Sequence, residues 1–175
     1  DETPATREAS MQMYHDSFKN LQVDHIDYYL LHSIGKSLED FQKRFIDNGM
    51  LDFLIEERKA GRIRNLGFSF HGDATVFDYA ISLHNKVHWD FVQIQLNYFD
   101  WQHASKDDVN GDYLYKQLNR RNIPSVIMEP LRGGRLAKIE FHLFSKLKQI
   151  RPDDTAAAWA FRYAASYPDV LTVLS

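Results

Sequence analysis

Apolar residues along the chain recur at two spacings, one typical of helices and the other typical of strands. Residues 3–20 repeat apolar side chains at helical intervals, and Thr3 followed by Pro4 predicts the start of this helix. The segment over 25–32 is short and rich in aliphatic and aromatic residues, which predicts a buried strand. The alternation continues, with helices expected over 37–60 (interrupted near 47–49), 73–83, 111–121, 141–149 and 155–165, and strands over 64–70, 91–97, 124–129 and 170–174.

Five predicted strands that are each separated by a helix require parallel pairing through right-handed crossovers. The order therefore predicts an α/β fold, either an open doubly wound sheet or a (β/α)8 TIM barrel. A complete barrel needs about 250 residues, whereas this chain has 175. We therefore expect residues 1–175 to form one incomplete barrel domain, with the other strands outside this sequence.

Composition and charge exclude several classes of protein. The chain is 44% hydrophobic with a net charge of -3, which is typical of a packed domain and not of a disordered one. Its charges are interspersed, so no basic face for nucleic acid is expected, and no apolar run approaches the ~20 residues of a membrane span. The acidic start does not resemble a signal peptide, and the lack of cysteine is compatible with a reducing cytosol, so we expect a cytoplasmic protein. The absence of cysteine excludes disulfides and thiolate metal sites, and the histidine spacing predicts no other metal site.

The strand expected over 91–97 carries polar residues where a buried strand should be apolar. Gln93, Gln95 and Asn97 fall on one face because side chains alternate along a strand. Buried amides need partners, so amides on the inward face near the carboxyl end of a barrel strand indicate a ligand site. The alternative interpretation is a ladder of amides satisfied by neighbouring strands.

His32 ends the otherwise apolar strand over 25–32. A histidine at this place can act as an acid–base group or donate a hydrogen bond to a substrate carbonyl. Barrel active sites gather at the carboxyl ends of the strands, which favours that interpretation. The alternative is a histidine that is simply satisfied in the core or at its rim.

Residues 128–136 leave a strand and enter a loop with two glycines and two arginines. Glycines allow close backbone approach, and N–H groups beside guanidinium charge suit a pyrophosphate. The segment is neither a P-loop nor a G-x-G-x-x-G motif. An ordinary turn is the alternative.

Five segments have the most specific wording in the chain: 21–32 (LQVDHIDYYLLH), 56–69 (EERKAGRIRNLGFS), 91–98 (FVQIQLNY), 123–131 (IPSVIMEPL) and 170–175 (VLTVLS). In order and spacing they resemble strands four to eight of the aldo-keto reductase family. Residues 67–71 and 129–136 are similar to a bacterial branch whose members often carry a C-terminal ferredoxin-like extension. An iron–sulfur cluster would lie only in such an extension, outside this sequence.

The resemblance implies hydride transfer between NADP(H), or NAD(H), and a small aldehyde or ketone. The family's active site contains Asp, Tyr, Lys and His, and only the histidine is matched here, by His32, which would orient the carbonyl. The resemblance places the Asp, Tyr and Lys before residue 1. Tyr28, Tyr29 and Lys36 flank His32 without occupying those positions.

For the cofactor, the resemblance assigns Ser69 and Gln93 to the nicotinamide carboxamide. Met128 stands where the family usually has an aromatic residue stacked on the nicotinamide ring, and Phe70 stands where an Asn commonly follows the serine. The turn after this strand would line the cofactor through Glu129, Leu131, Gly133 and Gly134.

Two other functions are compatible with parts of the sequence. One is a nucleotide-sensing or regulatory barrel subunit with little turnover, which the departures at Phe70 and Met128 favour. The other is a phosphate-binding barrel lyase, but none of the five predicted strands carries the Schiff-base lysine that it needs. The substrate, the preference for NADPH or NADH and the oligomeric state are not indicated by the sequence.

Overall fold

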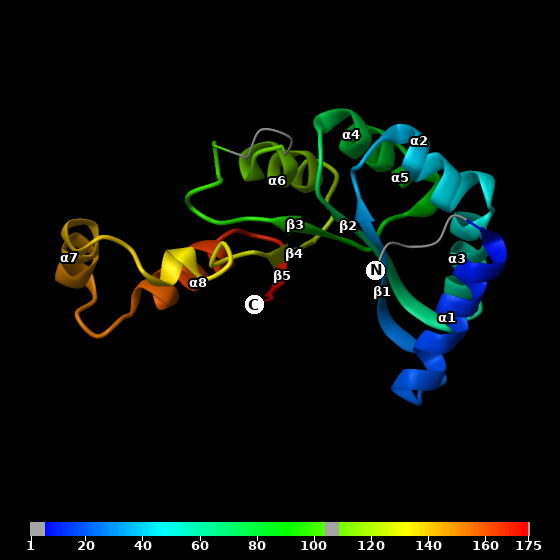
Figure 1. Ribbon diagram of the computed structural model, residues 1–175, viewed down its shortest axis with the longest axis horizontal. Coiled ribbons are helices and arrows are strands. Elements are labelled where there is room, and N and C mark those ends of the chain that lie inside the picture. Colours follow the sequence, from blue (N-terminus) through cyan, green and yellow to red (C-terminus); the bar gives the residue numbers. More distant parts are fainter. Residues whose placement is uncertain (1–5, 104–108, 175) are drawn as a thin grey trace. The chain divides into compact units, whose positions relative to one another are not determined.

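The structure, a computed structural model, describes residues 6–103 and 109–174, and its helices and strands alternate along the chain (Figure 1). The five strands are β1 (Ile26–Ile34), β2 (Ile63–Phe70), β3 (Phe91–Gln95), β4 (Ser125–Met128) and β5 (Val170–Val173). The helices are α1 (Arg7–Leu21), α2 (Leu38–Phe41), the π-helix η1 (Gln42–Asp47), α3 (Met50–Lys59), α4 (Ala74–Ser82), α5 (His84–Val87), α6 (Gly111–Asn119), the 3₁₀-helix η2 (Arg135–Ala137), α7 (Phe141–Ile150) and α8 (Ala156–Ala165).

The strands follow one another in the sheet in the order β1-β2-β3-β4-β5, and β1 pairs with β2, and β4 with β5, in parallel. This confirms the predicted α/β class. A doubly wound sheet needs a point where the strand order reverses, and the described strands contain no such reversal. Sequential parallel order is the arrangement of a barrel.

The described residues divide into two compact units, which are considered separately. The first unit comprises residues 6–92 and Val109, and the second comprises residues 93–103 and 110–174. The boundary falls within β3, between Val92 and Gln93.

In the first unit, helices cover one face of the β1–β2 pair. The rings of Phe68 and Phe70 pack against Phe77 of α4 at 6.3 and 5.0 Å. Tyr29 of β1 contacts Tyr14 of α1 at 5.6 Å. These residues alternate with those of the opposite face, so the helix-covered face holds the core of this unit.

Helix starts follow the capping signals in the sequence, with one shift. Asp73 caps α4, Asn110 caps α6 and Thr155 caps α8 through side-chain oxygens that accept backbone N–H groups. The predicted start at Thr3 and Pro4 lies outside the described residues. The structure begins α1 at Arg7, with Thr6 as its N-cap.

The expected interruption of the helix over 37–60 is confirmed. The chain runs through α2 and η1, and Gly49 then takes a left-handed conformation (φ 70°) before α3 begins. A left-handed residue ends one helical run and lets the next start in a new direction. Two short elements, α5 and η2, were not expected.

In the second unit, β4 and β5 pair beside helix α8, whose residues Ala156, Ala160 and Ala164 are buried. Small side chains at this spacing let the helix approach closely. Helix α7 has no buried residue. Within residues 6–103 and 109–174, no helix is long and apolar enough to cross a membrane.

Candidate functional site

The carboxyl end of β1 contains a local irregularity beside His32. The strand continues to Ile34, so His32 is not its last residue, as expected, but its third from last. Leu31 and Ile34, which strict alternation would place on opposite faces, are both buried, and Ser33 between them has φ +50°. The register with β2 shifts at the same place. This β-bulge leaves the side chain of His32 exposed on the face opposite the helices.

Ser69 lies next to this bulge on β2 and stabilises it. Its Oγ accepts a hydrogen bond from the backbone N–H of Ser33 at 2.8 Å. The side chain is 3% exposed. Because Leu30 pairs with Gly67 in the regular part of the register, His32 and Ser69 fall on the same face of the two strands. The structure therefore brings these two predicted site residues together.

Phe70 does not line that face. Its ring packs against Phe77 on the helix-covered side, and it is 2% exposed. The residue after Ser69 is therefore part of the core and contributes no polar group beside the serine.

Arg44 of η1 is a site residue that the sequence did not reveal. Its Nη2 donates to the carbonyl of His32 at 2.8 Å, and its Nη1 donates to the carbonyl of Ser33 at 3.3 Å and to Asp40 at 2.8 Å. The bulge turns these two carbonyls out of the strand ladder, and the guanidinium fork satisfies both. The only sequence signal was an Asp and an Arg four residues apart on a helix.

The turns that follow β1 and β2 cross at very close range. The N–H of His71 donates to the carbonyl of Ile34 at 3.0 Å. A Cβ added to Gly35 would lie 1.6 Å from the His71 oxygen, and one added to Gly72 would lie 2.1 Å from the Gly35 oxygen. Both residues also have positive φ. Only glycine fits at either place, and the crossing fixes the backbone just beyond His32 and Ser69.

Tyr29, three residues before His32 on β1, faces the helices. Burial raises the pKa of its hydroxyl to about 12. Its ring contacts Tyr14 and does not share the face of His32. The half-buried Tyr29 therefore packs against the helices and does not point toward the side chain of His32.

In the second unit, the three amide residues predicted on one face of β3 have different surroundings. Gln93 and Gln95 are half-buried in the strand, whereas β3 ends at Gln95 and Asn97 follows in a turn. Gln93 donates from Nε2 to the thioether sulfur of Met128 at 3.3 Å, a weak hydrogen bond. Gln95 donates to Asp100 at 2.8 Å. Gln93 thus keeps the greater capacity for another partner.

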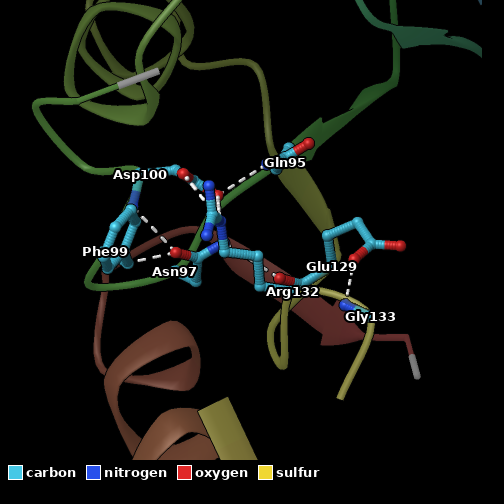
Figure 2. Close-up of polar contacts among 7 residues, drawn as sticks. All are labelled: Gln95, Asn97, Phe99, Asp100, Glu129, Arg132 and Gly133. Carbon is cyan, nitrogen blue, oxygen red and sulfur yellow. Dashed lines mark hydrogen bonds and ion pairs between the residues drawn. The ribbon is translucent and has the colours of Figure 1, made fainter. Parts of the chain in front are cut away.

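Asn97 is a structural anchor and not a strand residue, contrary to expectation. Its Oδ1 accepts the backbone N–H groups of Phe99 and Asp100 at 3.0 and 2.8 Å. Its Nδ2 donates to Asp100 Oδ2 at 2.9 Å and to the Glu129 carbonyl at 3.1 Å (Figure 2). The residue is fully buried and its hydrogen-bonding capacity is used. Asn97 is therefore a satisfied amide, as the alternative interpretation expected, but its partners lie in its own turn and at Glu129 and not in a ladder of amides.

The loop after β4 contains the remaining predicted cofactor residues. Met128 is the last residue of β4, and Glu129 follows with φ +56°. The Glu129 carboxylate accepts the N–H of Gly133 at 2.7 Å (Figure 2). Gly133 and Gly134 have φ values of +61° and +83°, and a Cβ on either would meet no atom within 4 Å. The space beside these two glycines is open. Leu131 is half-buried, and its carbonyl accepts the N–H of Leu136 at 3.0 Å.

The second unit also contains an apolar cavity of about 400 Å³, which lies away from the predicted cofactor residues. It is lined by Tyr98, Ile139, Leu143, Lys146, Leu147, Trp159 and Tyr163. None of the predicted site residues contributes to it. Among the described residues, no group of three or more His, Asp or Glu side chains could hold a metal ion.

The sequence model of the Aldo/keto reductase family matches residues 2–175. The chain belongs to this family. A comparison of the sequence with curated proteins finds no match.

Solved structures of bacterial aldo-keto reductases have the same fold. The chain is 19% identical to the holo form of an aldo-keto reductase from Bacillus halodurans, with a TM-score of 0.68 over 97% of this chain and 57% of that one. The chain is 18% identical to a glycerol dehydrogenase from Gluconobacter oxydans, with a TM-score of 0.70 over 97% of this chain and 55% of that one. The chain is 19% identical to a variant of the protein Gox0644 in complex with NADPH. The TM-score is 0.71, and the match covers 97% of this chain and 55% of that one.

This aldo/keto reductase chain thus spans little more than half the length of the structures that it matches. Together with the parallel sheet in sequential order, the match confirms the predicted fold, a partial (β/α)8 barrel. At this level of identity the structures show the fold and not the reaction.

Proposed function

We propose that this chain is part of an NAD(P)H-dependent oxidoreductase that reduces small aldehydes or ketones. The observation that carries the proposal is the arrangement at the carboxyl end of the β1–β2 pair, where an exposed imidazole and a buried hydroxyl share one face. Barrel enzymes build their active sites at this end of the strands. Membership in the Aldo/keto reductase family supports the proposal.

The residues present fit a nicotinamide. Ser69 Oγ already accepts the Ser33 N–H, so its own proton is left to donate to a carboxamide oxygen. No partner for Gln93 Oε1 is found within the described part of the chain, and this atom can accept a carboxamide N–H. The complex of Gox0644 with NADPH supports NADP(H) as the cofactor. Glu129, Leu131, Gly133 and Gly134 would line its path along the turn after β4.

In the proposed reaction, His32 donates a hydrogen bond to the substrate carbonyl oxygen. This orients the carbonyl and stabilises the negative charge that develops on its oxygen. The bound dinucleotide would supply the hydride to the carbonyl carbon. The proton donor, in the family a tyrosine, would precede residue 1. Met128 would pack its thioether against the ring where the family usually has an aromatic residue.

The test measures loss of NADPH absorbance with a panel of aldehydes, in the full-length protein and in His32→Ala. We expect turnover by the wild type and a drop in kcat/KM of roughly 100-fold or more in the variant. His142→Ala, at an exposed histidine of α7, is the matched control and should leave activity unchanged. An unaffected His32→Ala variant would contradict the role of His32, and absence of both NADPH binding and turnover in the wild type would contradict the function.

A regulatory, nucleotide-sensing subunit is the second candidate, and two observations favour it. Phe70 is committed to the core, and Met128 offers a flexible thioether in place of a rigid ring. A barrel with a weaker clamp on the nicotinamide could bind the nucleotide without efficient turnover. Tight NADPH binding with no aldehyde reduction would select this function. The cytoplasmic location, the bacterial origin, the single barrel domain and an iron–sulfur cluster in a C-terminal extension stay predictions.

A further inference from the structure

Asp100 is a buried carboxylate that the proposed reaction does not use. It lies in the turn after β3 and is 4% exposed. Burying a charge is unfavourable unless hydrogen bonds and an opposite charge compensate it. Its surroundings therefore indicate what it does.

Three side chains converge on this carboxylate. Gln95 Nε2 and Asn97 Nδ2 donate to its Oδ2 at 2.8 and 2.9 Å. Arg132 Nε lies 3.2 Å from both carboxylate oxygens (Figure 2). The first two donors belong to β3 and the turn that follows it, whereas Arg132 belongs to the turn after β4. The carboxylate thus joins two segments that are far apart in the sequence.

The guanidinium of Arg132 is fixed on a second side by an aromatic ring. Its central carbon lies 4.2 Å from the centroid of the Phe99 ring. Asn97 reinforces the connection by donating to the Glu129 carbonyl, at the start of the same turn. Arg132 is therefore held by its ε nitrogen and by the face of its plane.

The turn held in this way has an unfavourable backbone conformation. Glu129 and Arg132 have φ values of +56° and +51°, and Gly133 and Gly134 are also left-handed. Non-glycine residues rarely adopt this region because their Cβ approaches the following carbonyl oxygen, so the conformation persists only when its surroundings impose it. The Asp100–Arg132 pair, together with the Glu129–Gly133 hydrogen bond, supplies that constraint.

We infer that Asp100 is a positioning residue for dinucleotide binding: through Arg132 it fixes the turn over 129–134 that would line the cofactor. The inference rests on the proposed function. Asp100 itself touches no cofactor in this account. Loss of Asp100 should therefore weaken the affinity for the cofactor, because a turn that is not already fixed must be ordered when the dinucleotide binds.

The test is a double-variant cycle in the full-length protein, with the Kd for NADPH measured by fluorescence titration and kcat measured at saturating NADPH. Asp100→Asn keeps the volume but removes the charge and places an amide donor opposite other donors. Arg132→Lys keeps the charge but loses the planar fork, and it provides a second variant if the first does not fold. Asp112→Asn, in the exposed Asp112–Lys116 pair of α6, is the control.

We expect each single variant to raise the Kd about tenfold, the loss typical of a hydrogen bond to a charged group. The double variant should also lose about tenfold, since both changes break one interaction. We expect kcat to stay unchanged and the control to bind like the wild type. A purely structural residue would lower the amount of folded protein without this separation of Kd and kcat.

Two results would overturn the inference: wild-type affinity in Asp100→Asn, or losses that multiply in the double variant. If the wild-type protein itself does not bind NADPH, the proposed function fails instead. The two failures are thus distinguished by the wild-type titration alone.

Discussion

Two strand ends in this molecule are each stabilised by an Asp–Arg pair, but opposite members of the pairs are buried. At the end of β1, the Arg44 side chain is 5% exposed and that of Asp40 is 21% exposed. At the end of β3, the Asp100 side chain is 6% exposed and that of Arg132 is 29% exposed. Each arginine also lies over a phenylalanine ring, Phe45 in the first case and Phe99 in the second.

The difference follows from which backbone or side-chain groups each strand end leaves unsatisfied. The bulge in β1 releases two carbonyl oxygens, which need donors, and a guanidinium provides them in a fixed geometry. The turn after β3 brings amide N–H₂ groups together, which need an acceptor, and a carboxylate provides it. The sign of the buried charge is thus set by the polar groups around it.

The largest expected effect is that of Arg44→Ala. It removes the donor from two carbonyls and leaves Asp40 without its partner, so the free energy of unfolding should fall by about 3 kcal/mol. Arg132→Ala at the other strand end should cost only about 1 kcal/mol, because that guanidinium is partly hydrated. Urea unfolding of both variants checks the comparison, and equal losses would contradict it.

Among the two carboxylates the order is reversed, and Asp100→Ala at the end of β3 should lower the free energy of unfolding more than Asp40→Ala at the end of β1. The change at Asp100 leaves three donors without their acceptor, and we expect a loss of about 2 kcal/mol in the free energy of unfolding. Asp40→Ala, which removes the more exposed carboxylate of the other pair, should cost about 1 kcal/mol, because Arg44 keeps the carbonyls of His32 and Ser33 as partners. The same urea titrations report both values. A larger loss for Asp40→Ala than for Asp100→Ala would show that burial does not decide the cost.

Ser69→Ala should have a smaller effect on stability, of about 1 kcal/mol, because the N–H of Ser33 loses its acceptor in the β-bulge. Ser82→Ala is the matched control, since that hydroxyl only bonds a carbonyl within its own exposed helix end. If the two variants unfold at the same urea concentration, Ser69 does not stabilise the bulge. The Kd for NADPH, measured in parallel, should rise in Ser69→Ala alone.

A second buried carboxylate, Glu57, extends the comparison to pH. Its hydrogen bond with Arg62 holds its pKa below the usual value, and Tyr14 donates to it at 2.6 Å. A depressed folded-state pKa contributes stability above the unfolded value of about 4.3, and this contribution is lost as pH falls through the folded pKa. We expect the urea concentration at the midpoint of unfolding to fall as the pH drops below about 4. In Glu57→Gln this fall should be smaller than in the wild type. An identical pH profile in the two proteins would contradict this assignment.

Most of the fold could be predicted from the sequence, because it depends on local signals. Periodic apolar residues located every strand, and the side chains of Asp73 and Thr155 marked helix starts. The parallel direction of the strands followed from their alternation with helices. The choice between barrel and doubly wound sheet did not, since it depends on which strands are neighbours.

The site could be predicted only in part. His32 was recognisable by its place at a strand end and Ser69 only through the family resemblance, and the structure puts them on one face. Arg44 and Asp100 were not recognisable, because their roles come from contacts with the β1 bulge and with Arg132. Asn97 continued an alternating pattern that the chain abandons at the end of β3. Pattern reasoning does not detect a turn that starts with an amide cap.

The most direct test of the account is a crystal structure of the full-length protein with NADP⁺. We predict that the nicotinamide carboxamide contacts Ser69 Oγ and the Gln93 side chain, and that His32 lines the same pocket on the side where the carbonyl substrate binds. A structure in which His32 and Gln93 face separate cavities, or in which the dinucleotide binds away from the turn over 129–134, would contradict it.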